Sequence, residues 1–132
     1  MRTERAGVPS AAAVLGVLVL AVATAGCEDH VRRTAEQVTG GNPDRAAAAM
    51  RKYGCTSCHS IPGVPGAHAY VGPPLDGFRQ RSYIAGHVGN DATTLVRWIR
   101  HPHSLDGRTA MPEMGVTDQD ARDMAAYLYT LR

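Results

Sequence analysis

The sequence predicts an all-α domain of three to five short helices with one long loop. Two observations favour this class. Apolar residues recur at helical spacing in three segments, and each segment follows residues that can start a helix. Between the first two segments, residues 60–90 are rich in glycine and proline, which favours a loop over further regular structure.

The first helix is predicted to begin after Asn42, with Pro43 at its first position. Asparagine accepts a hydrogen bond from a free N–H group at a helix start, and proline has no N–H to leave unsatisfied there. The apolar side of this helix carries Ala46, Ala49, Met50 and Tyr53.

The second helix is predicted to begin at Asp91 or Thr93 and to end before Pro102, because proline breaks a helix interior. Its apolar side carries Leu95, Trp98 and Ile99.

The last helix is predicted to begin at Thr117, which forms a motif resembling a capping box with Asp120. We expect its apolar stripe to pack on the first helix. The stripe consists of Ala121, Met124, Ala125, Leu128 and Leu131.

Two cysteines followed directly by a histidine lie just after the first helix, at Cys55, Cys58 and His59. On a helical turn, thiols at this spacing lie on one side and can add to the two vinyl groups along one edge of a porphyrin. The histidine can then bind the iron as its proximal ligand. The pattern therefore predicts one covalent c-type haem.

Two other chemistries use the same cysteine spacing. A zinc site would need two more ligands, but the other cysteine, Cys27, lies far upstream in an apolar region, which leaves only dispersed histidines. A thioredoxin-like redox centre would need a strand-helix-strand pattern around the pair, which the sequence does not show. Both chemistries are less consistent with the sequence than haem.

A second axial ligand would complete the iron site. Met111 is the first candidate, because it lies in a loop rather than in a helical apolar stripe, where methionine is usually a core residue. Met114 is the second candidate. His87, His101 and His103 are further candidates for a site with two histidines.

Several motifs in this order resemble a small class I cytochrome c. They are GCTSCH at 54–59, GPPL at 72–75, LVRWI at 95–99, AMP at 110–112 and AAYL at 125–128. The resemblance covers residues 43–132 and implies a cytochrome c fold wrapped around a single covalent haem.

The resemblance implies a role for each matching residue. Cys55 and Cys58 would form the thioethers, and His59 and Met111 would bind the iron. Pro73 matches the proline whose carbonyl accepts a hydrogen bond from the ligand histidine, a bond that fixes the imidazole tautomer.

Other positions are assigned through the same resemblance. Leu75 would pack on the ring edge, and Trp98 would lie beside the methionine side of the haem. Tyr83 or Arg81 would reach a haem propionate.

The first helix departs from the family pattern at two positions. Ala47 and Arg51 stand where a glycine and an aromatic residue are common. We therefore expect the packing of the first helix on the last to differ in detail.

The N-terminus resembles a bacterial export signal over residues 1–26, with Arg2 and Arg5 before an apolar stretch at 11–25. As a helix this stretch would span about 22 Å, short of the roughly 30 Å of a bilayer core. The end of the signal is similar to a lipoprotein signal in which Cys27 becomes lipid-modified. An uncleaved anchor and ordinary cleavage are the alternatives.

Residues 27–42 are polar and of mixed charge, and are predicted to form a tether. Acyl chains on Cys27 would hold the domain at the periplasmic face of the cytoplasmic membrane. A tether of this length would let residues 43–132 swing between membrane partners.

Charge gives no sign of a nucleic-acid partner. The chain has 14 basic and 12 acidic side chains. Residues 1–26 hold two basic and one acidic side chain, so residues 27–132 have 12 basic and 11 acidic side chains. This near balance does not favour nucleic-acid binding.

The sequence predicts a one-electron carrier of a bacterial respiratory chain rather than an enzyme. The donor would be a quinol-oxidising complex, and the acceptor a haem-copper oxidase or another reductase. The tail is also similar to cytochrome c domains attached to, or encoded beside, haem-copper oxidases. The alternative is a gas sensor or enzyme with an open distal iron site near His101 or His103.

Overall fold

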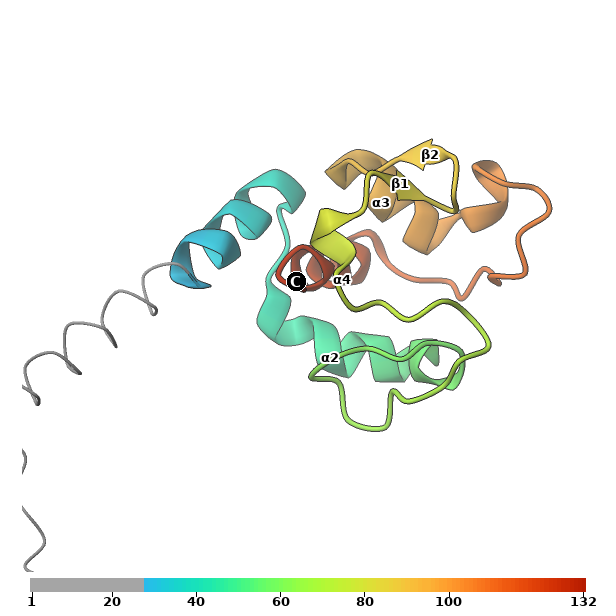
Figure 1. Ribbon diagram of the computed structural model, residues 1–132, viewed down its shortest axis with the longest axis horizontal. Helices are drawn as coiled ribbons and strands as arrows, with labels where there is room; N and C mark the ends of the chain where they lie inside the picture. The colour runs from blue at the N-terminus through green and yellow to red at the C-terminus, as the bar shows by residue number, and fades with distance from the viewer. Residues whose placement is uncertain (1–27) are drawn as a thin grey trace, which may run out of the picture. The chain divides into compact units, whose positions relative to one another are not determined.

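The computed structural model describes residues 28–132 and confirms the mainly helical class (Figure 1). Residues 28–39 are helical, and short 3₁₀ turns separate the later elements. The remaining elements are α2 (Pro43–Lys52), η1 (Cys55–Ser57), η2 (Phe78–Gln80), β1 (Tyr83–Ile84), β2 (Val88–Gly89), α3 (Ala92–Arg100), η3 (Pro102–Ser104) and α4 (Asp118–Leu128).

The predicted helix starts are present. The Asn42 side chain accepts the N–H of Asp44 at 2.9 Å, with proline at the first position of α2. Thr117 accepts a backbone N–H in the first turn of α4 at 3.2 Å. Asp91, rather than Thr93, caps α3. Local hydrogen bonding therefore sets where all three helices begin.

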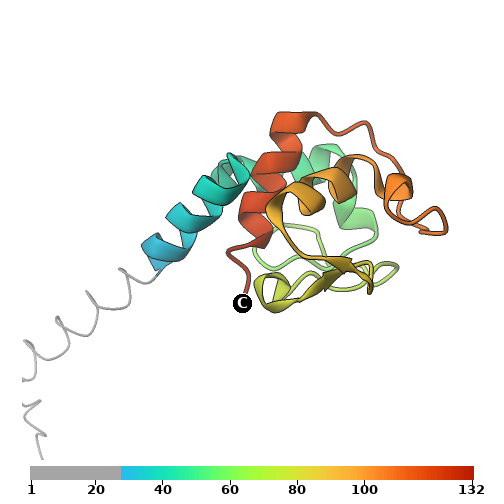
Figure 2. The same cartoon turned by 90° about the horizontal axis from the view of Figure 1, so that it is seen from above.

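Helix α4 lies in the middle of the domain, with α2 on one side and α3 on the other (Figures 1 and 2). Ala46 of α2 and Ala121 and Ala125 of α4 are each 0% exposed, and such small side chains let helices approach closely. The predicted contact between the last stripe and the first helix is thus confirmed. Ala47 is half-buried against this core, whereas Arg51 is exposed.

The buried carboxylate of Asp123 ties α4 to the start of α2. Its side chain is 1% exposed, and it accepts the N–H of Asn42 at 2.7 Å, two bonds from Arg45 at 2.6 and 2.8 Å, and one from Gln119 at 2.9 Å. Burial by itself would raise the pKa of this carboxyl, but the donors outweigh it and the pKa lies below its ordinary value. The charged form is therefore the one that stabilises the fold.

A small antiparallel hairpin that was not predicted from the sequence follows η2. Strands β1 and β2 pair Tyr83 with Gly89 and Ile84 with Val88. The turn has positive φ at two successive residues, 51° at Ala85 and 80° at Gly86, which is the geometry of a tight hairpin. The hairpin leads the chain into α3.

Part of the segment predicted as a tether, residues 27–42, is ordered in the structure. Residues 28–39 are helical, and Val31–Arg132 form one compact unit that includes the helix from residue 31 onward. This part of the segment is held by contacts with the domain, so it is not a free spacer. The predicted signal at 1–26 and Cys27 lie outside the described residues.

No helix within residues 28–132 is long and apolar enough to cross a membrane.

Replacement of Asp123 by asparagine tests the buried carboxylate. We expect Asp123→Asn to lower the free energy of unfolding at pH 7 by about 2 kcal/mol, because charge-assisted hydrogen bonds are lost in a buried place. Since the folded pKa is lowered, this stabilisation is present above the ordinary pKa of 3.8 and is lost as the pH falls through the folded pKa. Urea unfolding should therefore show a difference in the free energy of unfolding between the wild type and Asp123→Asn at pH 7, and this difference should disappear in acid.

The exposed residue Asp76 provides the matched control, Asp76→Asn, whose unfolding curve should overlay that of the wild type. If the free energy lost in Asp123→Asn did not change with pH, this would contradict a stabilising role for the charged Asp123 carboxylate.

Candidate haem site

The cysteine-histidine run forms a helical turn of its own just beyond α2. Gly54 adopts a left-handed conformation with φ 73°, which ends the preceding helix. The N–H groups of Cys58 and His59 then both donate to the carbonyl of Cys55, at 3.2 and 3.0 Å. The turn is the conformation that the motif predicts, although it is separated from α2 rather than continuous with it.

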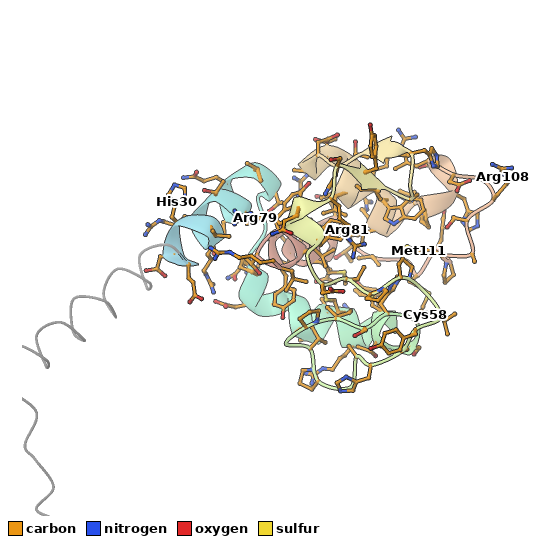
Figure 3. All side chains as sticks on the ribbon, in the orientation of Figure 1. His30, Cys58, Arg79, Arg81, Arg108 and Met111 are labelled. Carbon is orange, nitrogen blue, oxygen red and sulfur yellow. The ribbon has the colours of Figure 1, made fainter. Side chains whose placement is uncertain are left out.

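Both cysteines of the run are free thiols, and both are half-buried. Burial raises the pKa of the Cys55 thiol, so this sulfur stays protonated at neutral pH. Cys58 lies at the edge of the domain in Figure 3. Two thiols that are not paired with each other remain available to form thioethers.

A hydrogen bond to the backbone sets the orientation of the His59 imidazole. Its Nδ1 lies 2.7 Å from the carbonyl oxygen of Pro73. A carbonyl can only accept a hydrogen bond, so Nδ1 donates and carries the proton, and Nε2 of the neutral ring keeps its lone pair. This is the hydrogen bond that the family resemblance implied, and it makes Nε2 a ready metal ligand.

Backbone pairing brings the Pro73 carbonyl to the histidine. The Gly72 N–H donates to the carbonyl of Cys58, and the Leu75 N–H donates to that of Ser60, both at 2.8 Å. A Cβ atom at Gly72 would lie 2.5 Å from Cε1 of His59, so the ring packs directly on the glycine backbone. From the sequence, Gly72 was expected only as part of the GPPL motif, and its position just before the proline was the signal for this role.

The first part of the glycine- and proline-rich loop is anchored by its few apolar residues. Ile61, Val64 and Ala67 are all buried. The hydroxyl of Tyr127, on α4, donates to the carbonyl of Pro62 at 2.6 Å. The sequence singles out Tyr127 only as part of the AAYL motif, because nothing local connects it to a loop so far away along the chain.

The second part of the loop is held by Arg81. Its guanidinium donates to the carbonyls of Pro74 and Asp76, the latter at 3.0 Å, and lies 5.2 Å from the centre of the Phe78 ring. Tyr83 is 59% exposed on β1. A contact of either Arg81 or Tyr83 with a propionate stays a prediction. The hydrogen bonds that the structure shows for Arg81 are with the turn that carries Pro73.

Leu75 and Trp98 are both half-buried and pack against the hydrophobic core. Leu75 follows the proline turn, and Trp98 lies on α3. Each therefore keeps an exposed part, and their predicted positions beside a haem stay predictions.

The two candidate methionines occupy different surroundings. Met111 is half-buried in the loop after η3, where its N–H donates to the Thr109 hydroxyl at 3.2 Å. In Figure 3 it and Cys58 come from separate segments at the same end of the view. Met114 is 45% exposed, and its terminal carbon lies 3.7 Å from where a Cβ of Gly54 would be. Both methionines thus belong to the loop that would cover the second side of a haem.

The histidine candidates are dispersed over the surface. His87 lies in the hairpin turn, and His103 is exposed in η3. Nδ1 of His101 lies 3.6 Å from a carboxylate oxygen of Glu113. Within residues 28–132, no group of three or more histidine, cysteine, aspartate or glutamate side chains is arranged to hold a metal ion.

The residues present fit a covalent haem. Two free thiols share one helical turn with an imidazole whose Nδ1 is occupied and whose Nε2 has a lone pair. The free thiols can form the thioethers, and the Nε2 lone pair can bind the iron. The fold and the donor set thus define a helical domain for a c-type haem.

Residues 43–132 match the cytochrome c family, and the chain belongs to this family. It is a haem-based electron-transfer protein, and its cofactor is haem c with iron. The chain is also similar to the cytochrome c oxidase subunit 2 of Alkalihalophilus pseudofirmus, with 30% identity over 98 residues. The match covers 74% of this chain and 28% of that protein. No solved structure matches the chain.

The contact between Gly72 and the imidazole can be tested by adding one methyl group. We expect Gly72→Ala to displace His59 from the Pro73 carbonyl, because the added carbon would lie far inside van der Waals contact with the ring. The yield of haem-loaded protein should fall several-fold, as measured by haem absorbance per mole of chain.

Gly89 has nothing within 4 Å of an added Cβ, so Gly89→Ala is the matched control and should load haem normally. Equal loading of the two variants would show that the close packing on Gly72 is not required.

Proposed function

We propose that this chain is a one-electron carrier in a bacterial respiratory chain, with a single haem bound by Cys55 and Cys58. His59 and Met111 are the proposed iron ligands. The observation that carries the proposal is the hydrogen bond between His59 Nδ1 and the Pro73 carbonyl, which leaves Nε2 free to bind iron. One Cys-x-x-Cys-His run in the sequence supports one haem.

The haem iron supplies a one-electron couple, and the chain's own residues hold its ligands in place. His59 is fixed by Pro73 on one side of its ring and by Gly72 beneath it. The bond from Nδ1 to the Pro73 carbonyl would hold the imidazole in one orientation toward the iron. A thioether from Met111 would raise the reduction potential.

The comparison with the oxidase subunit supports the choice of partner. That relative is a cytochrome c oxidase subunit 2, and this chain spans about a quarter of its length. We propose a haem-copper oxidase as the acceptor, with another terminal reductase as the alternative, and a quinol-oxidising complex as the donor. The chain would act beside such an oxidase or as one of its subunits.

The proposed location is the periplasmic face of the cytoplasmic membrane. The sequence of residues 1–26 supports export, and Cys27 in its context supports a lipid anchor. Respiratory donors and acceptors are membrane complexes, so an anchor raises the local concentration of the carrier.

Replacement of Met111 tests the iron ligands. We expect Met111→Ala to abolish the sulfur-to-iron absorption band of the oxidised protein. The reduction potential should fall by on the order of 0.1 V, within the roughly 0.8 V that axial ligands span. Carbon monoxide should bind the reduced variant but not the reduced wild type.

Met114→Ala is the control, and its band and potential should stay close to those of the wild type. If the wild type itself bound carbon monoxide readily, the iron site would be open, and the chain would act as a gas sensor or an enzyme instead.

Replacement of Cys27 tests the anchor. We expect Cys27→Ser to move the haem protein from the membrane fraction to the soluble periplasmic fraction, because the acyl chains are lost. Haem stain after cell fractionation measures this, and mass spectrometry of the wild-type N-terminus identifies the lipid. Retention of Cys27→Ser in the membrane would favour an uncleaved anchor.

A further inference from the structure

The compact unit is longer than the family domain. The cytochrome c match begins at residue 43, but the unit begins at Val31. Residues 31–42, which we name the arm, are therefore an addition for which the family provides no role. In Figures 1 and 2 the arm comprises most of the blue-to-cyan helix and the turn that leads into α2.

The arm is joined to the domain by direct backbone contact. A Cβ atom at Gly41 would lie 2.0 Å from the carbonyl oxygen of Arg122, so only glycine allows this approach to α4. Gly40 turns the chain with φ 68°, and its N–H donates to the carbonyl of Glu36 at 2.8 Å. The N–H of Asn42 donates to the buried Asp123 carboxylate at 2.7 Å.

Buried side chains add to these contacts. Thr39 is 2% exposed and Ala35 is 3% exposed. The Thr39 hydroxyl donates to the Ala35 carbonyl at 2.7 Å and accepts the N–H of Gly41 at 3.1 Å. The guanidinium of Arg122 donates to the Thr39 carbonyl at 3.2 Å. The end of the arm is thus bonded to α4 through both main chain and side chain.

An ion pair joins the arm to α2 as well. Arg32 donates to Asp44 with one nitrogen at 2.7 Å and with a second nitrogen, and donates to Glu36 at 3.2 Å. Exposed pairs of this kind contribute little stability by themselves. Their geometry is nevertheless set by the helix and the turn that Gly41 and Thr39 hold in place.

We propose that the arm is rigid with the cytochrome domain, instead of acting as a flexible tether. The arm meets the first residue of α2, whereas the Cys55–His59 turn follows the last. Since α2 has 10 residues, about 15 Å of helix separates the two. The arm and the haem-binding turn therefore lie at opposite ends of α2, as Figure 3 shows for Cys58.

This rigidity bears on how the domain reaches a partner, a step that rests on the proposed anchor at Cys27. A rigid arm adds no slack between the anchor and the domain, so the haem-binding end reaches a smaller volume than a flexible tether of the same length would allow.

Paired nitroxide labels can measure the rigidity of the arm in the haem-loaded protein. The labels are placed at Gln37→Cys on the arm and Ala48→Cys on α2, both exposed, in a chain that carries Cys27→Ser. We expect a single narrow distance distribution from pulsed electron resonance. Gly41→Ala should broaden it several-fold without a change in the haem spectrum, and Gly89→Ala should leave it narrow. A broad distribution in the parent, or a narrow one in Gly41→Ala, would overturn the proposal.

Amide exchange in the parent protein keeps the proposal testable should Gly41→Ala fail to fold. The N–H groups of Gly40, Gly41 and Asn42 all have acceptors. We expect them to exchange on the order of 100-fold more slowly than in an unstructured peptide. Unprotected amides would show that the arm is free. Neither measurement requires a lipid or a redox partner, so failure of the arm and failure of the proposed function are distinguishable.

Discussion

The close packing of α4 against α2 is the constraint on which the rest of the domain depends. The contact is made by residues with almost no side-chain volume, and Ala46, Ala121 and Ala125 are fully buried in it. Larger side chains would separate the helices, and the α2 helix leads directly into the haem-binding turn. The buried Asp123 closes one end of this interface through the backbone of Asn42. A displacement of α4 would thus be transmitted to the cysteines, to the loop bonded to Tyr127 and to the arm.

The site itself depends on orientation more than on the number of ligands. An imidazole can bind iron only through a nitrogen that lacks a proton, and the Pro73 carbonyl decides which nitrogen that is. That carbonyl is held by pairing of residues 72–75 with 58–60, and the turn is in turn bonded to Arg81. The glycine- and proline-rich loop is therefore an ordered support for His59, although it contains little regular secondary structure.

A rigid arm would affect how such a carrier meets its partners. A tethered domain finds partners by diffusion within the reach of its linker, and a rigid extension shortens that reach. In an assembly with an oxidase, a shorter reach would favour one neighbouring partner and limit which complexes can be served. The similarity to part of a cytochrome c oxidase subunit 2 is consistent with such an assembly.

The sequence by itself determined the fold class, the starts of the first and last helices and the haem-binding run, and it narrowed the start of the middle helix to two residues, because each depends on residues close together in the chain. Asn42, Asp91 and Thr117 cap helices through bonds to neighbouring N–H groups. Only the tertiary structure decided that Gly72 packs on His59 and that Tyr127 supports the loop. The same holds for residues 31–42, which composition described as a polar tether. Their contacts with α4 join residues about 80 positions apart. Because the burial of residues 31–42 depends on this distant helix, no local sequence pattern predicts it.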